Sequence, residues 1–267
     1  MRIAAIQMVS STDLNSNLIL AENLLNQAAE QGAELVVLPE YFCLMGHNDE
    51  DKRAIAEDEA GGPLQEYLGA QAKRLGIWLV GGTIPLKSPS GKVTNTQLVY
   101  NPRGELVARY DKIHLFAFKR GNESYDESVV QQGGSTVTAF DLPSQDGHTW
   151  RVGLSTCYDL RFPELYRQLR ADLILVPSAF TYTTGQAHWE ILLRARAIEN
   201  LAWLAAPAQG GHHANGRRTW GQTLVANPWG KIVAQLSEGE GVVVADLDWE
   251  LMQEVRQQLP ALQHRRL

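Results

Sequence analysis

Cys157, one of the two cysteines in the chain, stands in a sequence context that suits a nucleophile of acyl transfer. The preceding residues, 151–156, have the pattern of a buried strand, and Pro163 a few positions later predicts the first turn of a helix. A cysteine on a strand-to-helix turn exposes its sulfur beside backbone N–H groups, and the helix N-terminus is expected to favour its thiolate. The alternative for any lone cysteine is a small buried hydrophobic residue, but the context of Cys157 favours a nucleophile.

Glu40 and Lys112 are charged residues that border apolar segments. Glu40 comes shortly after residues 35–38, a Leu-Val-Val-Leu run that predicts a buried strand, and ligand sites gather where the strands of α/β sheets end. Lys112 lies in the segment Asp-Lys-Ile-His-Leu-Phe, among aliphatic and aromatic residues. Each has a plainer alternative when taken alone, because most glutamates are solvated and a lysine can reach past apolar neighbours to water. We interpret His114 as a half-buried histidine with a backbone partner.

The segments around these residues alternate between strand-like and helix-like patterns. Strands are expected over residues 2–9, 35–38, 77–83, 94–100, 105–110, 151–156, 173–177, 201–208, 222–227, 231–235 and 241–246. Helices are expected over residues 14–31, 62–74, 163–169 and 187–200. Two similar halves of this kind with no linker between them predict one layered α/β domain over residues 1–267.

Composition narrows the class of protein. The chain has 267 residues, of which 44% are hydrophobic and 20% charged, which is enough for one sizeable core. A net charge of −6 argues against nucleic acid as the main partner, and no apolar run approaches the roughly 18 residues of a membrane helix. Two cysteines do not make a disulfide scaffold, and the N-terminus lacks the apolar stretch of a signal peptide. We therefore expect a cytoplasmic protein without a membrane partner.

The order of the motifs resembles that of the nitrilase superfamily of carbon–nitrogen hydrolases. The resemblance is carried by Leu-Pro-Glu-Tyr-Phe around Glu40, Asp-Lys-Ile-His-Leu-Phe around Lys112, and Cys-Tyr-Asp-Leu-Arg-Phe-Pro-Glu from Cys157 onward. Further similar segments are 126–128, 187–200 and 227–230. The likeness extends over a core of about residues 3–246 and leaves a C-terminal tail at 247–267. This likeness favours catalytic roles for Glu40, Lys112 and Cys157 over a solvated glutamate, a surface lysine and a buried, unreactive thiol.

The resemblance implies a fold, an assembly and a set of roles. The fold is a four-layer αββα sandwich of the α/β class, and the active unit is a homodimer or a larger homo-oligomer. Cys157 is the nucleophile that forms a thioester, Glu40 the general base, and Lys112 the group that stabilises the oxyanion together with the backbone N–H of Tyr158. Glu127 is similar to a second acidic residue that positions the substrate and the lysine. These are the groups that acyl transfer needs, and neither a metal nor another cofactor is implied.

Two branches of the superfamily resemble the chain most, and both are amidases of small carboxylate-bearing molecules. One branch acts on deaminated glutathione, the other is that of the omega-amidases acting on 2-oxoglutaramate and 2-oxosuccinamate. Segments 42–46, 192–196 and 209–213 look more like the first branch, so we expect deaminated glutathione as the substrate. The alternatives are an omega-amidase, an aliphatic nitrilase and a catalytically inactive binding module, although an intact catalytic set argues against the last.

Arg161 is a candidate for binding the substrate's carboxylate. It lies four residues after Cys157, and a guanidinium can hold a carboxylate through two parallel hydrogen bonds. An internal ion pair of Arg161 with Asp159 or Glu164 is an equally supported alternative.

Three further residues are candidates for lining the pocket: Tyr41, Phe180 and Thr181. A metal site at the adjacent histidines His212 and His213 is not expected, because the sequence offers no third ligand at a useful spacing.

Overall fold

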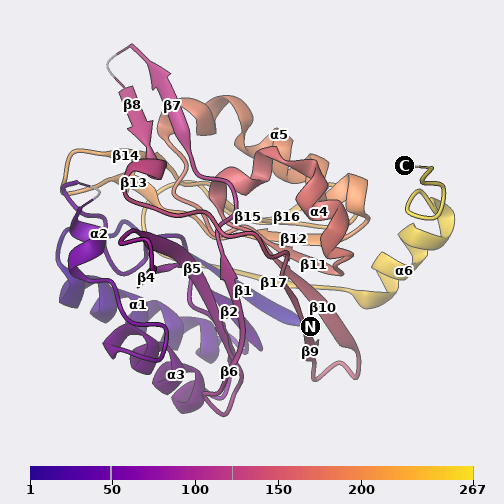
Figure 1. Cartoon of the computed structure of the whole chain (residues 1–267). Coiled ribbons are helices and arrows are strands. Elements are labelled where there is room, and N and C mark those ends of the chain that lie inside the picture. The colour runs from indigo at the N-terminus through magenta and orange to yellow at the C-terminus, as the bar shows by residue number, and fades with distance from the viewer. Residues whose placement is uncertain (49, 122, 267) are drawn as a thin grey trace.

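Two β-sheets form the centre of the computed structural model, which describes residues 1–267 except 49, 122 and 267 (Figure 1). The first sheet contains, in spatial order, β17 (Gly241–Asp246), β1 (Arg2–Gln7), β2 (Leu35–Val37), β3 (Trp78–Val80), β5 (Val93–Tyr100) and β4 (Ile84–Lys87), with β6 (Leu106–Asp111) also paired to β5. The second contains β16 (Ile232–Leu236), β15 (Thr223–Ala226), β12 (Trp203–Ala206), β11 (Leu173–Leu175), β10 (Thr149–Leu154) and β9 (Ala139–Pro143).

Two short hairpins and the helices complete the molecule. The hairpins are β7 (Ala117–Arg120) with β8 (Glu123–Asp126), which projects from the body in Figure 1, and β13 (Gly210–His212) with β14 (Arg218–Trp220). The α-helices are α1 (Leu14–Glu30), α2 (Asp51–Ala54), α3 (Pro63–Leu75), α4 (Pro163–Leu169), α5 (Tyr182–Asn200) and α6 (Trp249–Gln258). Short 3₁₀ turns cover Glu127–Val129 and Cys157–Arg161.

Three hydrophobic clusters separate four layers. The central cluster joins the two sheets and includes Val37 and Val80 from the first sheet with Leu154 and Trp203 from the second. A second cluster lies between the first sheet and helices α1 and α3, and a third between the second sheet and helices α4 and α5. This arrangement confirms the predicted αββα sandwich.

The alternation of side chains along β1 shows why its residues are apolar on both faces. Ile3 and Ala5 belong to the central cluster, whereas Ala4 and Ile6 belong to the cluster under the helices. Successive strand residues point to opposite faces, and both faces of this sheet are covered. An apolar run without polar alternation is therefore what a central strand of a sandwich requires.

Several elements differ from the sequence predictions. The helix expected over 187–200 begins at Tyr182, and the strand expected over 77–83 ends at Val80, before two consecutive glycines. The C-terminal tail contains α6, and the hairpins β7–β8 and β13–β14 were not predicted. The two hairpins matter most, because residues next to them line the candidate active site: Phe116 and Glu127 flank the first hairpin, and Arg217 lies in the loop of the second.

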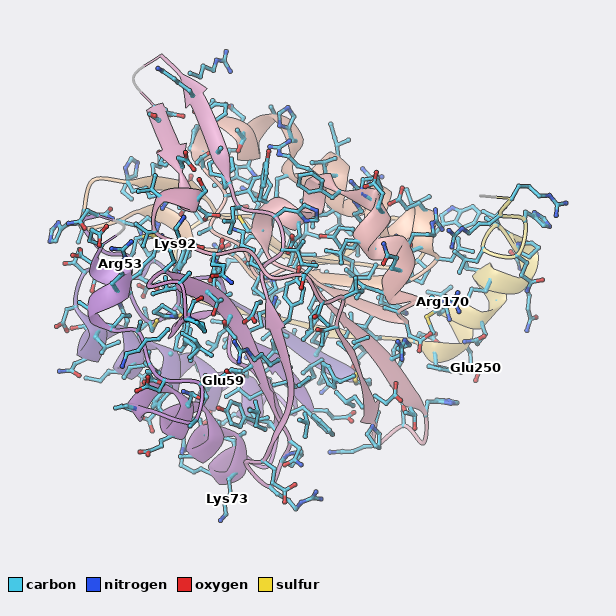
Figure 2. The ribbon with its side chains drawn as sticks, viewed as in Figure 1. Arg53, Glu59, Lys73, Lys92, Arg170 and Glu250 are labelled. Carbon is cyan, nitrogen blue, oxygen red and sulfur yellow. The ribbon has the colours of Figure 1, made fainter. Side chains whose placement is uncertain are left out.

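Charged side chains cover the outer layers. In Figure 2, Lys73 points away from α3 and Glu250 away from α6, and both are exposed. Among the described residues, no helix combines the length and the apolar character needed to cross a bilayer.

Candidate active site

Glu40, Lys112 and Glu127 form one buried charged cluster. The Nζ of Lys112 donates to Oε1 of Glu40 at 3.0 Å and to the two carboxylate oxygens of Glu127 at 3.0 and 2.8 Å. The side chains of Lys112 and Glu40 are 0% and 1% exposed, and that of Glu127 is 12% exposed. The structure thus brings together three charged residues that the sequence motifs singled out separately.

Cys157 lies in the wall of the cavity that Glu40 and Glu127 also line. The cavity has about 290 Å³ of empty space, and its wall is formed by Glu40, Tyr41, Phe116, Glu127, Cys157, Tyr158, Ala179, Phe180, Thr181, Thr184 and Arg217. The thiol, two carboxylates and several aromatic and hydroxyl side chains therefore border one space.

A strained turn positions the Cys157 thiol. Strand β10 ends just before it, and Cys157 itself has a φ of 50°, in the left-handed region that non-glycine residues avoid. Its N–H donates to the carbonyl of Pro177 at 3.0 Å, while Asp159 accepts from the Thr156 N–H at 2.8 Å and from the Tyr110 hydroxyl at 2.6 Å. The turn is fixed from both sides, as expected for a nucleophile that must point into a cavity.

Glu40 is held by hydrogen bonds to both of its carboxylate oxygens. Oε2 accepts from the backbone N–H of Ala179 at 2.8 Å, and Oε1 accepts from the Asn95 side chain at 2.8 Å in addition to Lys112. The backbone beside it is closely packed, because a Cβ on Gly82 would lie 2.1 Å from the carbonyl oxygen of Pro39. The carboxylate thus has a fixed orientation in the cavity wall.

The lysine and the second glutamate stabilise each other's charged form. Burial lowers the pKa of Lys112, but the carboxylates of Glu127 and Glu40 outweigh it and raise that pKa well above its ordinary value. Burial raises the pKa of Glu127, and the ammonium groups of Lys112 and Lys52 together with hydrogen bonds reverse this, so the pKa is lowered. Lys112 therefore stays an ammonium and Glu127 a carboxylate at neutral pH.

Tyr41 links the cluster to two buried amides. Its hydroxyl donates to Oε1 of Glu127 at 2.9 Å and accepts from the side chains of Asn95 at 3.1 Å and Gln131 at 2.9 Å. Burial, and then the charges of Glu127 and Glu40, raise the pKa of Tyr41 well above its ordinary value. The tyrosine consequently remains a hydrogen-bond donor to Glu127.

The environment of Cys157 favours the neutral thiol, so the expectation that the helix N-terminus favours a thiolate is wrong. Burial raises the pKa of Cys157 most, the Glu40 and Glu127 carboxylates raise it further, and Lys112 opposes them. A thiol in this state needs a base beside it to become a nucleophile, and Glu40 is that neighbour.

The remaining predicted residues divide into two groups. Tyr41, Tyr158, Phe180 and Thr181 all line the cavity. Arg161 is not among the described residues that line it. Its guanidinium lies 5.7 Å from the ring centres of both Tyr158 and Phe180 and 3.3 Å from Nδ1 of His188.

The rings of His114 and His213 are both held by contacts within the protein. His114 is half-buried and donates its backbone N–H to Asp159, while its ring lies 2.7 Å from the same carboxylate and stacks on Phe162. Both ring nitrogens of His213 are hydrogen-bonded, to the carbonyl of Ser10 at 2.8 Å and to the Thr219 hydroxyl at 2.7 Å.

Sequence reasoning missed Asn95, Gln131 and Arg217. Asn95 and Gln131 are buried polar residues outside every motif, and Arg217 lies in the loop between β13 and β14. For Arg217 alone the sequence offered a signal: the Asn-Gly-Arg-Arg run at 215–218 predicts a turn with two neighbouring arginines.

Comparison with known proteins defines the class. The sequence model of the carbon–nitrogen hydrolases matches residues 2–257, so the chain belongs to the carbon–nitrogen hydrolase family. It is accordingly a hydrolase of carbon–nitrogen bonds other than peptide bonds, which confirms the resemblance to the nitrilase superfamily.

Three relatives place the chain within that class. It is 40% identical to the deaminated glutathione amidase of Synechocystis sp. over 270 residues, which are 98% of this chain and 97% of that protein. It is 36% identical to the human omega-amidase NIT2 over 271 residues, 99% of this chain and 95% of that protein. A mutant of the amidase from Nesterenkonia sp. AN1, a member of the nitrilase superfamily, has a similar structure with a TM-score of 0.82 and 29% identity over 100% of this chain and 94% of that one. The active-site cysteine of that mutant carries the acetamide moiety of fluoroacetamide.

Proposed function

We propose that the protein is an amidase in which Cys157 forms a thioester with the acyl part of a small, carboxylate-bearing amide. The observation that carries this proposal is the 3.0 Å hydrogen bond that Lys112 donates to Glu40, a carboxylate that lines the same cavity as Cys157. It places a base and a cation beside a thiol that is neutral at rest. An activated nucleophile, a base and an oxyanion donor are the requirements of acyl transfer.

The reaction proceeds in two halves in this proposal. The Cys157 thiol loses its proton to Glu40, and the sulfur forms a bond to the carbonyl carbon of the amide. The ammonium of Lys112 and the backbone N–H of Tyr158 stabilise the oxyanion, and the C–N bond breaks as the amine leaves with the proton from Glu40. Glu40 then takes a proton from water, the hydroxide attacks the thioester, and the acid is released as the thiol regains its proton.

Glu127 and Tyr41 act as positioning residues. Glu127 accepts two hydrogen bonds from Lys112 and one from the backbone N–H of Phe116 at 2.7 Å. Tyr41 fixes the orientation of Glu127 through its hydroxyl. Their charge and geometry hold the ammonium beside Glu40, which is the role that preorganised groups play in acyl transfer.

Deaminated glutathione is the substrate we propose. The Synechocystis relative that carries this name is 40% identical over almost the whole chain, and the human omega-amidase at 36% supports 2-oxoglutaramate or 2-oxosuccinamate as the second candidate. Purified protein should therefore be assayed against deaminated glutathione, 2-oxoglutaramate and an aliphatic nitrile, with detection of the released amine or ammonia. Hydrolysis of the nitrile alone, or of nothing, would contradict the proposal.

We also propose that residues 1–267 act as one domain in a homodimer or larger homo-oligomer. One domain is supported by the central cluster, which takes residues from both sheets. An assembly is supported by apolar side chains exposed on α5 and the neighbouring β15–β16 turn, where Ile191, Ile198 and Trp229 are 70%, 45% and 62% exposed. Light scattering on the purified protein tests the assembly. A cytoplasmic location stays a prediction from the sequence, for cell fractionation to test.

A further inference from the structure

We propose that Arg217 is the specificity-determining residue that binds the substrate's carboxylate inside the catalytic cavity. The proposal rests on the amidase function, and it names the group that recognises the acid end of the acyl chain. Arg217 follows β13 (Gly210–His212) and directly precedes β14 (Arg218–Trp220). It lines the same cavity as Cys157, Glu40 and Glu127.

The guanidinium of Arg217 is short of hydrogen-bond acceptors. Its Nε is buried and has no partner, and one terminal nitrogen lies 3.9 Å from the sulfur of Met45, which is a weak acceptor. The charged group lies 5.2 Å from the ring centre of Tyr125, and no carboxylate in the described part of the chain forms an ion pair with it. A half-buried cation in this state is destabilising, and a carboxylate supplies the acceptors that it lacks.

Lys112 is not equivalent to Arg217, because it already has its partners. Its ammonium donates to Glu40 and to both oxygens of Glu127. Lys52 lies near the same cluster and, like Lys112, lowers the pKa of Glu127. The two carboxylates therefore already face two ammonium groups, and Arg217 supplies a further positive charge in the cavity wall for an anionic substrate.

The loop that carries Arg217 is fixed in place. The Arg217 N–H donates to Oδ1 of Asn215 at 2.9 Å, and the Arg217 carbonyl accepts from the backbone N–H of His213 at 2.8 Å. The Asn215 side chain in turn donates to the carbonyl of Gly46 at 2.6 Å, and the His213 ring binds the carbonyl of Ser10. A preorganised cation loses little conformational entropy when it binds its ligand.

Arg161, the residue that the sequence suggested for this role, has a different environment. Its guanidinium is stacked near the rings of Tyr158 and Phe180 and contacts His188. It does not line the cavity within the described chain, whereas Arg217 does. In this proposal the acyl chain extends from Cys157 to a carboxylate held by Arg217, because both residues line the same cavity.

The test compares Arg217→Ala and Arg217→Lys with Arg218→Ala as the matched control. Arg218 is the next residue, carries the same charge, stacks on Tyr182 and pairs with Glu238 at 3.6 Å, and does not line the cavity. Each variant is assayed with 2-oxoglutaramate and with its methyl ester. Arg217→Ala should lower kcat/KM for the acid roughly ten- to a hundredfold, mainly through KM, and leave the ester nearly unchanged. Arg217→Lys should lose part of this preference, and Arg218→Ala should keep the wild-type ratio.

A binding measurement separates this proposal from the amidase function itself. Glutarate, a dicarboxylate that fits the acyl side of the reaction, is titrated calorimetrically into the wild type and into each variant. Arg217→Ala should bind it roughly ten- to a hundredfold more weakly, whether or not the wild type turns over either amide. Inactive wild-type protein that binds glutarate through Arg217 would overturn only the amidase function. Equal binding by wild type and Arg217→Ala, no binding by the wild type, or equal loss on acid and ester would overturn the role of Arg217.

Discussion

Oε1 of Glu40 accepts a 3.0 Å hydrogen bond from Nζ of Lys112, although the two residues are 72 positions apart and both are buried. Removing two charges from water is costly, and a buried ion pair is weak evidence for a gain in stability. The pair instead fixes a base and a cation beside the thiol of Cys157.

The two cysteines should differ in function. Cys157→Ala should abolish turnover and leave the fold intact, because it removes the proposed covalent nucleophile. Cys43→Ala should keep most activity, since Cys43 is buried with its sulfur 3.9 Å from the carbonyl of Thr83 and burial raises its pKa to about 12. Activity assays with circular dichroism spectra check both variants. An active Cys157→Ala enzyme would show that the wrong thiol has been assigned.

Glu40→Gln and Lys112→Ala should lower kcat far more than they change KM. Glu40→Gln removes proton transfer, which supplies about 10²–10⁴-fold, and Lys112→Ala removes an oxyanion donor, typically worth about 10²–10³-fold. Steady-state kinetics on the preferred amide measure the two constants separately. A large increase in KM at unchanged kcat would instead make either residue a binding residue.

The sequence predicted most of the layers and the centre of the site, because these depend on local patterns. Apolar runs such as 35–38 predict strands of a covered sheet, and the motifs around Glu40, Lys112 and Cys157 are contiguous. The strands expected over residues 94–100 and 105–110 correspond to β5 and β6, which pair antiparallel.

The supporting residues could not be predicted, because their roles arise only from tertiary contacts. Asn95 looks like an ordinary polar residue of a strand, yet it donates to both Glu40 and Tyr41. Arg217 reaches the cavity from a hairpin whose short strands carry little apolar pattern. The thiol of Cys157 was misjudged for a related reason, since the turn geometry is local but burial and the Glu40 charge are not.

The reactivity of Cys157 should shift in opposite directions when its two charged neighbours are removed. The Glu40 carboxylate raises the pKa of the thiol, so Glu40→Gln should move alkylation to lower pH. The Lys112 ammonium lowers that pKa, so Lys112→Met should move alkylation to higher pH. Iodoacetamide rates at one fixed pH of about 9, in a Cys43→Ala background where Cys157 is the reporting thiol, should therefore rise in Glu40→Gln and fall in Lys112→Met. Shifts of the same sign in both variants would refute this account of the electrostatics.

Arg161→Ala should lower stability and leave the preference for acid over ester unchanged. The guanidinium stacks near the rings of Tyr158 and Phe180, and such contacts are worth about 0.5–2 kcal/mol. The expected loss is a few degrees in Tm, with some loss of kcat because Tyr158 supplies the proposed oxyanion N–H. Thermal unfolding and the kcat/KM ratio for 2-oxoglutaramate and its methyl ester measure these effects. A collapse of that ratio at unchanged Tm would identify Arg161 as the carboxylate-binding residue instead.

Two glycines with similar positive φ values should respond differently to alanine. Gly82 and Gly76 have φ values of +53° and +64°, so alanine is strained by about 1–2 kcal/mol at either position. A Cβ at Gly76 meets nothing within 4 Å, whereas one at Gly82 would lie 2.1 Å from the carbonyl oxygen of Pro39, the residue before Glu40. Gly82→Ala must therefore displace the segment that positions the base, at a further cost of about 1–3 kcal/mol.

We expect Gly76→Ala to lower Tm modestly with kcat unchanged, and Gly82→Ala to lower both Tm and kcat. Denaturant unfolding and steady-state kinetics on the two variants supply the comparison. Because the left-handed strain is common to both, the excess effect at Gly82 measures the close approach of its backbone to Pro39. Equal effects of the two substitutions on kcat would mean that the position of Glu40 does not depend on this contact.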